Sequence, residues 1–179
     1  TRGLFVDGNS VRYLPPVPDP SKFLCIGKNS GAHREELIAE GMLKERPEEP
    51  TGFIKLTENM VGQDAEVVRP AGISTLDYEP ELAFVVGMQA SGVAKADALK
   101  HVVALTVFND LTAREIQKRE VTSGTRFWTA KNMPGFAPIG PFCVTLDEIA
   151  DPFDLWLTCH VNGTPRLREN TSQYIYRID

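Results

Sequence analysis

The sequence predicts a mixed α+β fold that is mainly β, built as one main domain with a short N-terminal extension. Short runs of apolar, strand-forming residues recur along the chain, and Gly, Pro and Asn-Gly turn signals separate them. Only three or four segments, all short, have helical composition. At 179 residues, with 42% hydrophobic and 24% charged residues, the chain has the size and composition of a single globular domain.

Residues 1–20 are expected to form an N-terminal hairpin followed by a linker. Apolar and polar residues alternate over residues 4–14 around Asp7-Gly8-Asn9, a pattern that favours a small hairpin. Prolines at positions 15, 16, 18 and 20 follow, and proline is excluded from central strands. The main domain is therefore expected to span residues 21–179, and its first strand to occupy residues 23–27.

A helix is expected over residues 32–44, where His33 and Glu36 are three residues apart and share one face. On the residues alone, a solvated helix is the commoner explanation of such a pair. The helix lies between a glycine loop and a charged, Pro-containing segment at residues 45–50. That composition is typical of a mobile lid, so we expect an N-terminal lid helix here.

Further strands are expected over residues 53–56, 67–70 and 79–87, and the last of these begins with Glu79 and Glu81. Side chains two residues apart on a strand point to the same face. Two neighbouring carboxylates repel each other unless a cation lies between them, which indicates a divalent metal. The alternative is the solvent-facing side of an edge strand, which is commoner for such a short pattern.

Asp110 is the third candidate ligand, because it ends the apolar run at residues 101–109. Three carboxylates at strand ends suit a hard cation such as Mg²⁺ or Mn²⁺. Short helices are expected over residues 95–100 and 111–120, and Arg114 and Gln117 share a face of the second. Lys131 lies in the loop that follows, where a lysine is usually only solvated.

The remaining strands are expected over residues 142–145, 155–160, 165–169 and 174–176. Asn162-Gly163 joins the second and third of these and is a strong hairpin signal. The three cysteines, at positions 25, 143 and 159, are odd in number and lack metal-type spacing. We expect them to be buried thiols in a reducing compartment.

The charge of the chain limits its partners. A net charge of −5 and a pI near 5.3 disfavour a nucleic-acid-binding role. We find neither an apolar run long enough to span a bilayer nor a signal-peptide pattern, so a cytoplasmic location without membrane association is expected.

Several stretches together identify a resemblance. In order along nearly the whole chain, they are Cys25-Ile26-Gly27-Lys28-Asn29 with His33, Phe53-Ile54-Lys55, Asp77-Tyr78-Glu79-Pro80-Glu81-Leu82-Ala83, Asn109-Asp110-Leu111-Thr112-Ala113-Arg114, Ala130-Lys131-Asn132, Pro138-Ile139-Gly140-Pro141, and Val161-Asn162-Gly163 leading to Asn170-Thr171-Ser172. This ordered set resembles the fumarylacetoacetate hydrolase (FAH) family, particularly its short members that act on acylpyruvates and oxaloacetate.

The resemblance implies a mixed β-sandwich or β-roll that assembles as a homodimer. It also implies the roles of nine side chains: Glu79, Glu81 and Asp110 bind Mg²⁺ or Mn²⁺, His33 and Glu36 form a dyad on the lid, Lys131 contacts substrate oxygens, Arg114 and Gln117 line the pocket, and Thr171 binds the substrate carboxylate.

The activity implied is metal-dependent hydrolysis of a C–C bond in an acylpyruvate, a 2,4-dioxo acid such as fumarylpyruvate, through an enolate that the metal stabilises. His33, held by Glu36, would activate the attacking water. Two alternatives use the same site: an oxaloacetate decarboxylase or tautomerase, and an isomerase of hydroxymuconate type. A third, of another class, is a non-catalytic β-module that binds a metal or ligand.

The chain departs from the family pattern at three places. Ser30-Gly31-Ala32 replaces an aromatic-Ala-Asp run before the histidine, which affects lid closure. Asn132-Met133-Pro134-Gly135-Phe136 replaces the commoner Ser/Thr-Phe-Asp after the lysine, which alters the pocket wall and the choice of substrate. The family also continues with a Gly- and Thr-rich segment, so the domain is expected to lack its C-terminal part.

Overall fold

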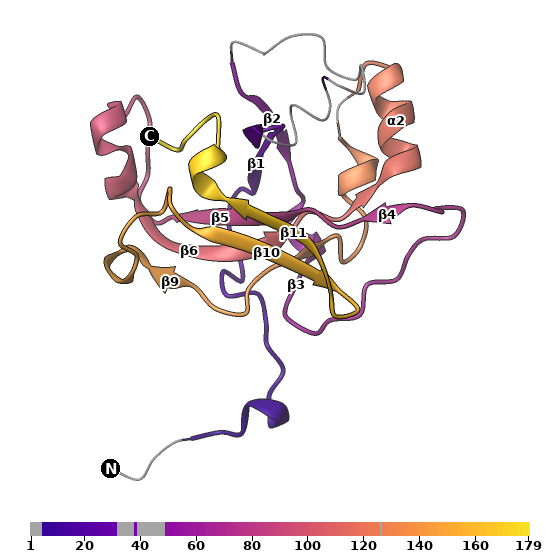
Figure 1. Ribbon diagram of the computed structural model, residues 1–179, viewed down its shortest axis with the longest axis horizontal. Helices are drawn as coiled ribbons and strands as arrows, with labels where there is room; N and C mark the ends of the chain where they lie inside the picture. Colours follow the sequence, from indigo (N-terminus) through magenta and orange to yellow (C-terminus); the bar gives the residue numbers. More distant parts are fainter. Residues whose placement is uncertain (1–4, 32–37, 39–48, 126) are drawn as a thin grey trace.

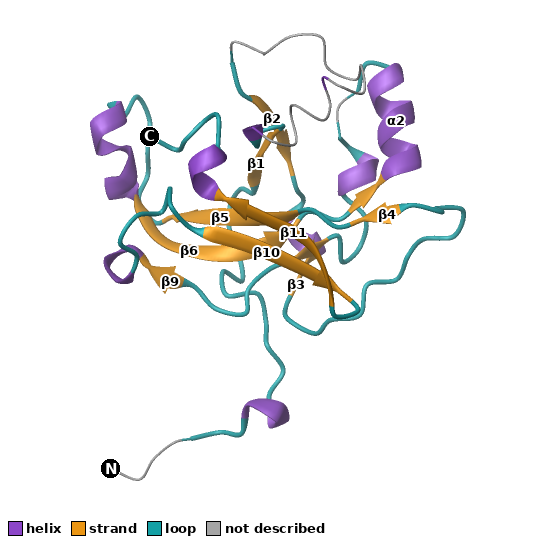
Figure 2. Ribbon diagram, in the orientation of Figure 1, coloured by secondary structure: helices purple, strands orange, loops and turns teal. Residues whose placement is uncertain are grey.

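The computed structural model describes residues 5–31, 38, 49–125 and 127–179. Strands dominate this part of the chain, and its longest helix is α2 (Arg114–Thr122) (Figures 1 and 2). Its 3-10 helices include η1 (Gly8–Ser10), η3 (Lys95–His101), η4 (Thr129–Lys131) and η6 (Thr171–Gln173). The strands are β1 (Leu24–Gly27), β2 (Thr51–Ile54), β3 (Met60–Val61), β4 (Leu76–Asp77), β5 (Pro80–Val86), β6 (Val102–Asn109), β7 (Thr112–Ala113), β8 (Ala137–Pro138), β9 (Val144–Thr145), β10 (Trp156–Val161) and β11 (Thr164–Asn170). The predicted α+β, mainly β class is confirmed.

The central sheet has the order β5-β6-β9, and both of its pairings are antiparallel. Val, Thr and Phe make up most of β6, and these residue types favour strands. Strands β5 and β9 flank β6 on its two sides. The antiparallel hairpin β10-β11 lies across β5 and β6 (Figure 1). Phe84 of β5 stacks on Phe153, just before β10, with ring centroids 6.2 Å apart. The sheet and the hairpin therefore form the two layers of a β-sandwich.

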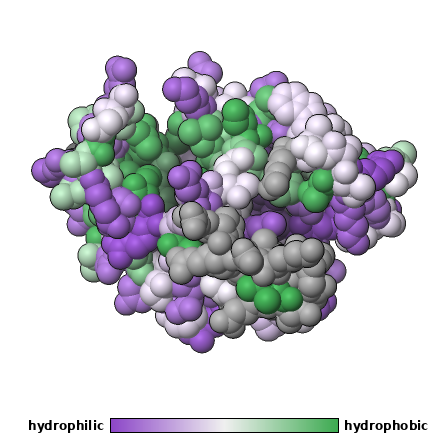
Figure 3. Space-filling view, turned by 90° about the horizontal axis from the view of Figure 1, so that it is seen from above, coloured by the Kyte–Doolittle hydropathy of each residue, from purple (hydrophilic) through white to green (hydrophobic). Residues whose placement is uncertain are grey.

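Smaller sheets surround this sandwich: β1 pairs with β2, β3 with β8, and β4 with β7. The pair β1-β2 and helix α2 lie on the same side of the central sheet (Figure 1). Leu24 and Ile54 are cross-strand partners in β1-β2, and they are 64% and 54% exposed. Apolar and polar side chains are mixed on the face seen in Figure 3. The outer face of β1-β2 thus leaves apolar side chains uncovered in this part of the chain.

Two buried clusters fix the segments that carry the candidate site. One consists of Ile73, Leu111, Ala113 and Phe136, and the other of Phe108, Ala137 and Ile139. Residues 108–113 contribute to both clusters, and so do residues 136–139. The end of β6 and the chain before β8 are therefore anchored in the core, which holds Asp110 and Lys131 between rigid supports.

The predicted N-terminal hairpin is wrong. Described residues 5–20 contain no strand and instead form η1. Asp7 accepts a hydrogen bond from Asn9 N at 3.0 Å through its side chain, and its carbonyl accepts one from Ser10 Oγ at 2.7 Å. These local contacts compete with strand pairing and favour a turn. The boundary at residue 20 stays a prediction.

Other expectations had mixed outcomes. The hairpin at Asn162-Gly163 is confirmed, since both residues have positive φ, 51° and 76°, and join β10 to β11. No strand forms over residues 67–70, and the expected strand at 174–176 is reduced to an isolated bridge between Ser30 and Tyr174. The expected lid helix at 32–44, apart from residue 38, lies outside the described residues. Along the described ranges, no helix has the length and apolar character needed to cross a membrane.

Candidate functional site

Strand pairing brings the three predicted carboxylate positions to one end of the central sheet. Pro80 of β5 pairs with Asn109 of β6, and Asp110 N donates to Glu79 O at 2.8 Å. Asn109 Oδ1 also accepts from Glu79 N at 3.0 Å. Glu79 thus lies one residue before β5, Glu81 is its second residue, and Asp110 follows the end of β6.

Lys131 joins two of these carboxylates. Its Nζ donates to Glu79 Oε2 and to Asp110 Oδ2, and the residue is only 3% exposed. Rings of Phe53 and Phe127 lie on its other side, with centroids 5.1 and 5.9 Å from Nζ. The lysine that the sequence placed in a loop is therefore a buried cation between two carboxylates and two aromatic faces.

Helix α2 supplies a second cation through Arg114, its first residue. The guanidinium donates from Nη2 to Glu79 Oε1 at 2.5 Å and from Nε to Asp77 Oδ2 at 2.5 Å. Its Nη1 donates to Gln117 Oε1 at 2.8 Å, so the predicted shared face of Arg114 and Gln117 exists. This geometry fixes the Glu79 carboxylate from the side opposite Lys131.

Lys55, which follows β2, is a member of the site that sequence reasoning missed. Its side chain is fully buried, and its Nζ donates to Asp110 Oδ1 at 2.7 Å and to Phe136 O at 2.8 Å. The run Phe53-Ile54-Lys55 belonged to the resemblance, but no role was assigned to the lysine. The available signal was a charged residue at the end of a short apolar strand, which indicates a buried partner.

Burial and neighbouring opposite charges shift the pKa values of Glu79, Asp110 and Lys55 in opposite directions. Burial raises the pKa of Glu79, but the charges of Lys131 and Arg114 outweigh it and hold the pKa below its ordinary value. Burial also raises the pKa of Asp110 and lowers that of Lys55, and their contact offsets part of each shift.

Glu81 differs from the other two carboxylates, because burial and neighbouring anions together raise its pKa more than nearby cations lower it. Burial, followed by the negative charges of Glu79 and Asp110, raises the pKa of Glu81 to about 8. Lys131 offsets only part of this rise. In the metal-free site Glu81 therefore tends to keep its proton, and a divalent cation beside it would favour the ionised carboxylate instead.

The donors of this cluster fit a hard divalent cation, since all three carboxylates supply oxygen. No three His, Cys, Asp or Glu side chains within the described ranges are arranged to hold a metal as they stand. The ammonium of Lys131 lies between Glu79 and Asp110 instead. Binding a metal would therefore require these side chains to reorient or to share their oxygens with Lys131.

Two contacts hold the turn that presents Lys131. Glu120 of α2 accepts from Thr129 N at 2.6 Å, at the start of η4. Asn132, which follows η4, hydrogen-bonds to Ile54 O and Leu56 N, the backbone groups on either side of Lys55. The turn is thus fixed at both ends.

Thr171 is buried, and its hydroxyl has partners within the fold. Its Oγ1 accepts from Leu155 N at 2.9 Å and donates to Pro152 O at 3.1 Å. These bonds fasten η6 to the segment before β10. Its predicted role in binding the substrate carboxylate stays a prediction. His33 and Glu36 lie outside the described residues, so their predicted dyad also stays a prediction.

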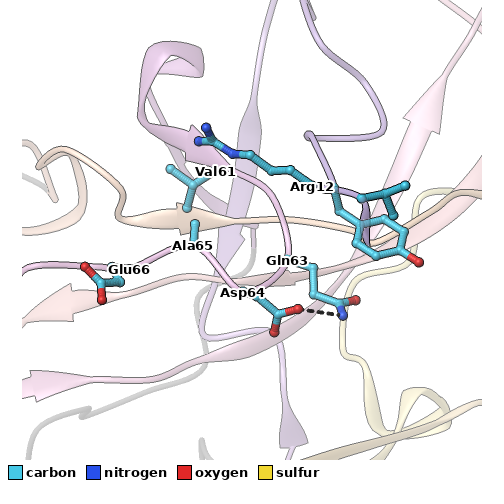
Figure 4. A pocket seen from close by; sticks show the side chains of 8 residues that line it. Arg12, Val61, Gln63, Asp64, Ala65 and Glu66 are labelled. Carbon is cyan, nitrogen blue, oxygen red and sulfur yellow. Dashed lines mark hydrogen bonds between the residues drawn. The ribbon is translucent and has the colours of Figure 1, made fainter. Parts of the chain in front are cut away.

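A separate surface pocket of about 480 Å³ lies between the N-terminal arm and the turn after β3 (Figure 4). Arg12 comes from the arm, whereas Gln63, Asp64 and Glu66 come from the turn. Gln63 donates to Asp64 at 3.1 Å. None of its lining residues belongs to the carboxylate cluster.

Comparison with known proteins identifies the family to which the chain belongs. Residues 22–179 match the model of the fumarylacetoacetate (FAA) hydrolase C-terminal domain. The chain belongs to the fumarylacetoacetate hydrolase family. Mitochondrial oxaloacetate tautomerase FAHD2A of Homo sapiens is 35% identical over 171 residues, which are 96% of this chain and 52% of that protein. The chain therefore spans about half the length of this curated relative.

Solved structures of FAH proteins share the fold. The 5-carboxymethyl-2-hydroxymuconate delta-isomerase of Mycobacterium smegmatis is 34% identical, with a TM-score of 0.76 over 91% of this chain and 60% of that one. The fumarylpyruvate hydrolase of Pseudomonas aeruginosa, solved with Mn²⁺ and pyruvate, is 25% identical, with a TM-score of 0.80 over 99% of this chain and 77% of that one. These FAH relatives thus carry three different activities in their names.

Proposed function

We propose that this FAH protein is a metal-dependent enzyme that forms an enolate from a small 2-oxo acid, and that it hydrolyses a C–C bond of an acylpyruvate such as fumarylpyruvate. The observation that carries the proposal is the buried cluster in which Glu79, Glu81 and Asp110 meet the cations of Lys131, Lys55 and Arg114. Such a cluster concentrates charge where a substrate anion and a metal could be held together.

Glu79, Glu81 and Asp110 would hold Mg²⁺ or Mn²⁺, since their oxygens are the ligands that hard cations prefer. The bound ion would supply Lewis-acid chemistry at the keto oxygen of the substrate. The likeness to the Mn²⁺ complex of the fumarylpyruvate hydrolase supports this assignment.

Lys131 and Arg114 would act on the substrate through their charge. The ammonium of Lys131 would bind the oxygen on which negative charge develops, and its buried surroundings would strengthen that interaction. Arg114, oriented by Asp77 and Gln117, would hold Glu79 in place and line the pocket. His33 with Glu36 would take the proton of the attacking water, and Thr171 would bind the substrate carboxylate.

Oxaloacetate tautomerisation is the second candidate function. The 35% identity to an oxaloacetate tautomerase over 96% of this chain favours it. This reaction needs proton transfer at the same enolate and no attacking water. An isomerase reaction of hydroxymuconate type would use the same groups, in line with the named isomerase structure.

A substrate panel separates these reactions. Acylpyruvates, oxaloacetate and hydroxymuconate-type diacids would be assayed on the full-length protein, with Mn²⁺ and with a chelator. We expect the protein to release pyruvate from an acylpyruvate, and we expect this release to require Mn²⁺. Keto–enol conversion of oxaloacetate without pyruvate release would favour the tautomerase instead. Mn²⁺ binding without turnover of any substrate would favour a non-catalytic binding module.

The predicted homodimer and the cytoplasmic location remain proposals. The uncovered apolar side chains of β1-β2 support association with a second copy, which sedimentation of the full-length protein would test. The matched human tautomerase is named as mitochondrial, so fractionation of the source cells is needed to assign the compartment.

A further inference from the structure

Asn132 uses its whole side-chain amide to join two segments of the site. Its Oδ1 accepts from Leu56 N at 2.7 Å. Its Nδ2 donates to Ile54 O and to Trp128 O, both at 3.0 Å. These three bonds use both N–H donors of the amide and its acceptor oxygen.

The partners of this amide lie directly beside the two buried lysines. Ile54 and Leu56 flank Lys55 in the sequence, and Asn132 itself follows Lys131. The two lysines bind opposite oxygens of one carboxylate, since Lys55 contacts Asp110 Oδ1 and Lys131 contacts Oδ2. The separation of the two ammonium groups around Asp110 therefore depends on how these two backbone segments are joined.

We propose that Asn132 is a positioning residue that fixes Lys55 and Lys131 relative to Asp110, and so sets the affinity of the carboxylate cluster for a divalent cation. This inference rests on the proposed function in that it takes the cluster to be the metal site. If either lysine were displaced, the Asp110 carboxylate would rotate or would lose part of the positive charge that offsets its own. Loss of such supporting contacts weakens metal binding.

The residue type at this position determines the link. A serine or threonine at this position would have a single hydroxyl on a shorter side chain. It cannot bind two carbonyl groups and a backbone N–H in this arrangement. Glu120 holds the opposite end of η4 through Thr129 N, so loss of the amide would loosen one end of the turn and leave the other fixed.

The experiment compares Mn²⁺ binding, by calorimetry with the metal alone, in full-length wild type and in Asn132→Ser and Asn132→Asp. Asn132→Asp keeps the size of the side chain and the acceptor for Leu56 N, but it lacks both donors. We expect each variant to bind Mn²⁺ about tenfold more weakly, the low end for a supporting residue of a metal site. Binding would be measured well below the unfolding temperature of every protein.

Asn29→Ser is the matched control. The Asn29 amide also joins two backbone groups, since Nδ2 donates to Tyr176 O at 2.8 Å and Oδ1 accepts from Tyr176 N at 2.7 Å. It contacts neither lysine in these bonds. We expect this variant to lose thermal stability and to keep the Mn²⁺ affinity of the wild type.

Two results would overturn the inference: wild-type affinity in both Asn132 variants, or an equal loss in Asn29→Ser. If the wild type itself bound no Mn²⁺, the proposed function and the effect of Asn132 on metal affinity would both fail, and a double-mutant cycle would then decide whether Asn132 positions the two lysines. Non-additive destabilisation by Asn132→Ser and Lys55→Met would support the link between the two segments, whereas additive losses would contradict it.

Discussion

Asp110 is bound by a lysine on each of its carboxylate oxygens, and this arrangement governs the chemistry of the cluster at the scale of single residues. A buried charge is costly unless it is paired, and each of these groups provides the partner that another needs. The site is therefore sensitive to the loss of any one member, including Lys55, for which the sequence alone predicted no role.

Lys55→Met should destabilise the protein by about 3–5 kcal/mol, because it leaves the Asp110 carboxylate with one partner fewer in the core. Denaturant unfolding measures this loss. Lys100→Met is the control: it removes the same charge from a pair with Asp97 whose lysine is 73% exposed. Its cost should be under about 1 kcal/mol. Equal effects of the two substitutions would contradict the structural role of Lys55.

Glu81 should make the stability of the metal-free protein depend on pH. Its pKa lies near 8 in the fold and near 4.5 ordinarily, so the folded state holds this proton more tightly. The resulting stability is fully present below pH 4.5 and is lost as pH rises through about 8. Thermal unfolding in chelator should therefore show falling stability over this range. Glu81→Gln, which cannot ionise, should remove that decline, and a decline of unchanged size would refute the explanation.

At the scale of secondary-structure elements, helix α2 connects the carboxylate cluster to the segment before β4. Glu115 accepts hydrogen bonds from Ser74 Oγ, from Ser74 N at 3.1 Å and from Thr75 N at 2.9 Å. Arg114 N also donates to Thr75 O at 3.1 Å. The start of α2, which carries Arg114, is therefore fixed against residues 74–75.

Glu115→Ala should raise the hydrogen-exchange rates of the Ser74 and Thr75 amides, because both lose their acceptor.

The same exchange should depend on pH. The hydrogen bond from the Ser74 side chain is the main cause that lowers the pKa of Glu115 to about 2. Protection by the carboxylate should thus persist above pH 4.5 and be lost only as pH falls through about 2. Exchange at Ser123 N, which donates to Arg119 O at the far end of α2, should not change. A uniform rise along α2 would instead indicate general unfolding.

The sequence predicted elements well where apolar pattern and turn chemistry agree. Strands β5 and β6 were expected from their apolar runs, and β10-β11 from Asn162-Gly163. It failed around Asp7, where side-chain bonds to the backbone replaced the expected hairpin. Residues 67–70 failed for a different reason, because a short apolar run forms a strand only when a partner strand is available.

The candidate site was predictable from the sequence only in part. Glu79, Glu81 and Asp110 were predictable as neighbours, since they lie at the ends of two apolar runs. Spacing left a solvent-facing alternative open, and their role as metal ligands, which the resemblance implies, stays a prediction. The contacts of Lys55 and Asn132 could not, because they join residues 55 and 76 positions apart along the chain. They form only when the chain after β2 comes beside Asp110, at the end of β6, and beside Asn132, after η4.

At the scale of the whole molecule, metal binding should couple to folding. A ligand that binds only the folded state stabilises it by about 2.7 kcal/mol at a concentration 100 times its dissociation constant. For a chain of this size, that corresponds to a rise in unfolding temperature of roughly 5–10 °C. Thermal unfolding with Mn²⁺ and with a chelator measures this rise in unfolding temperature. Glu81→Gln should abolish most of the rise, and an equal rise in this variant would place the metal elsewhere.

Direct counting of bound Mn²⁺, by the electron paramagnetic resonance signal of the free ion, tests most directly whether the three carboxylates form a metal site. The account predicts one saturable site per chain in the wild type. Asp110→Asn should weaken it at least about tenfold, because it replaces a charged ligand, whose loss should cost no less than the loss of a supporting residue. Asp147→Asn, at an exposed aspartate in the turn after β9, should bind as the wild type does. Unchanged binding in Asp110→Asn, or no saturable site in the wild type, would contradict the account.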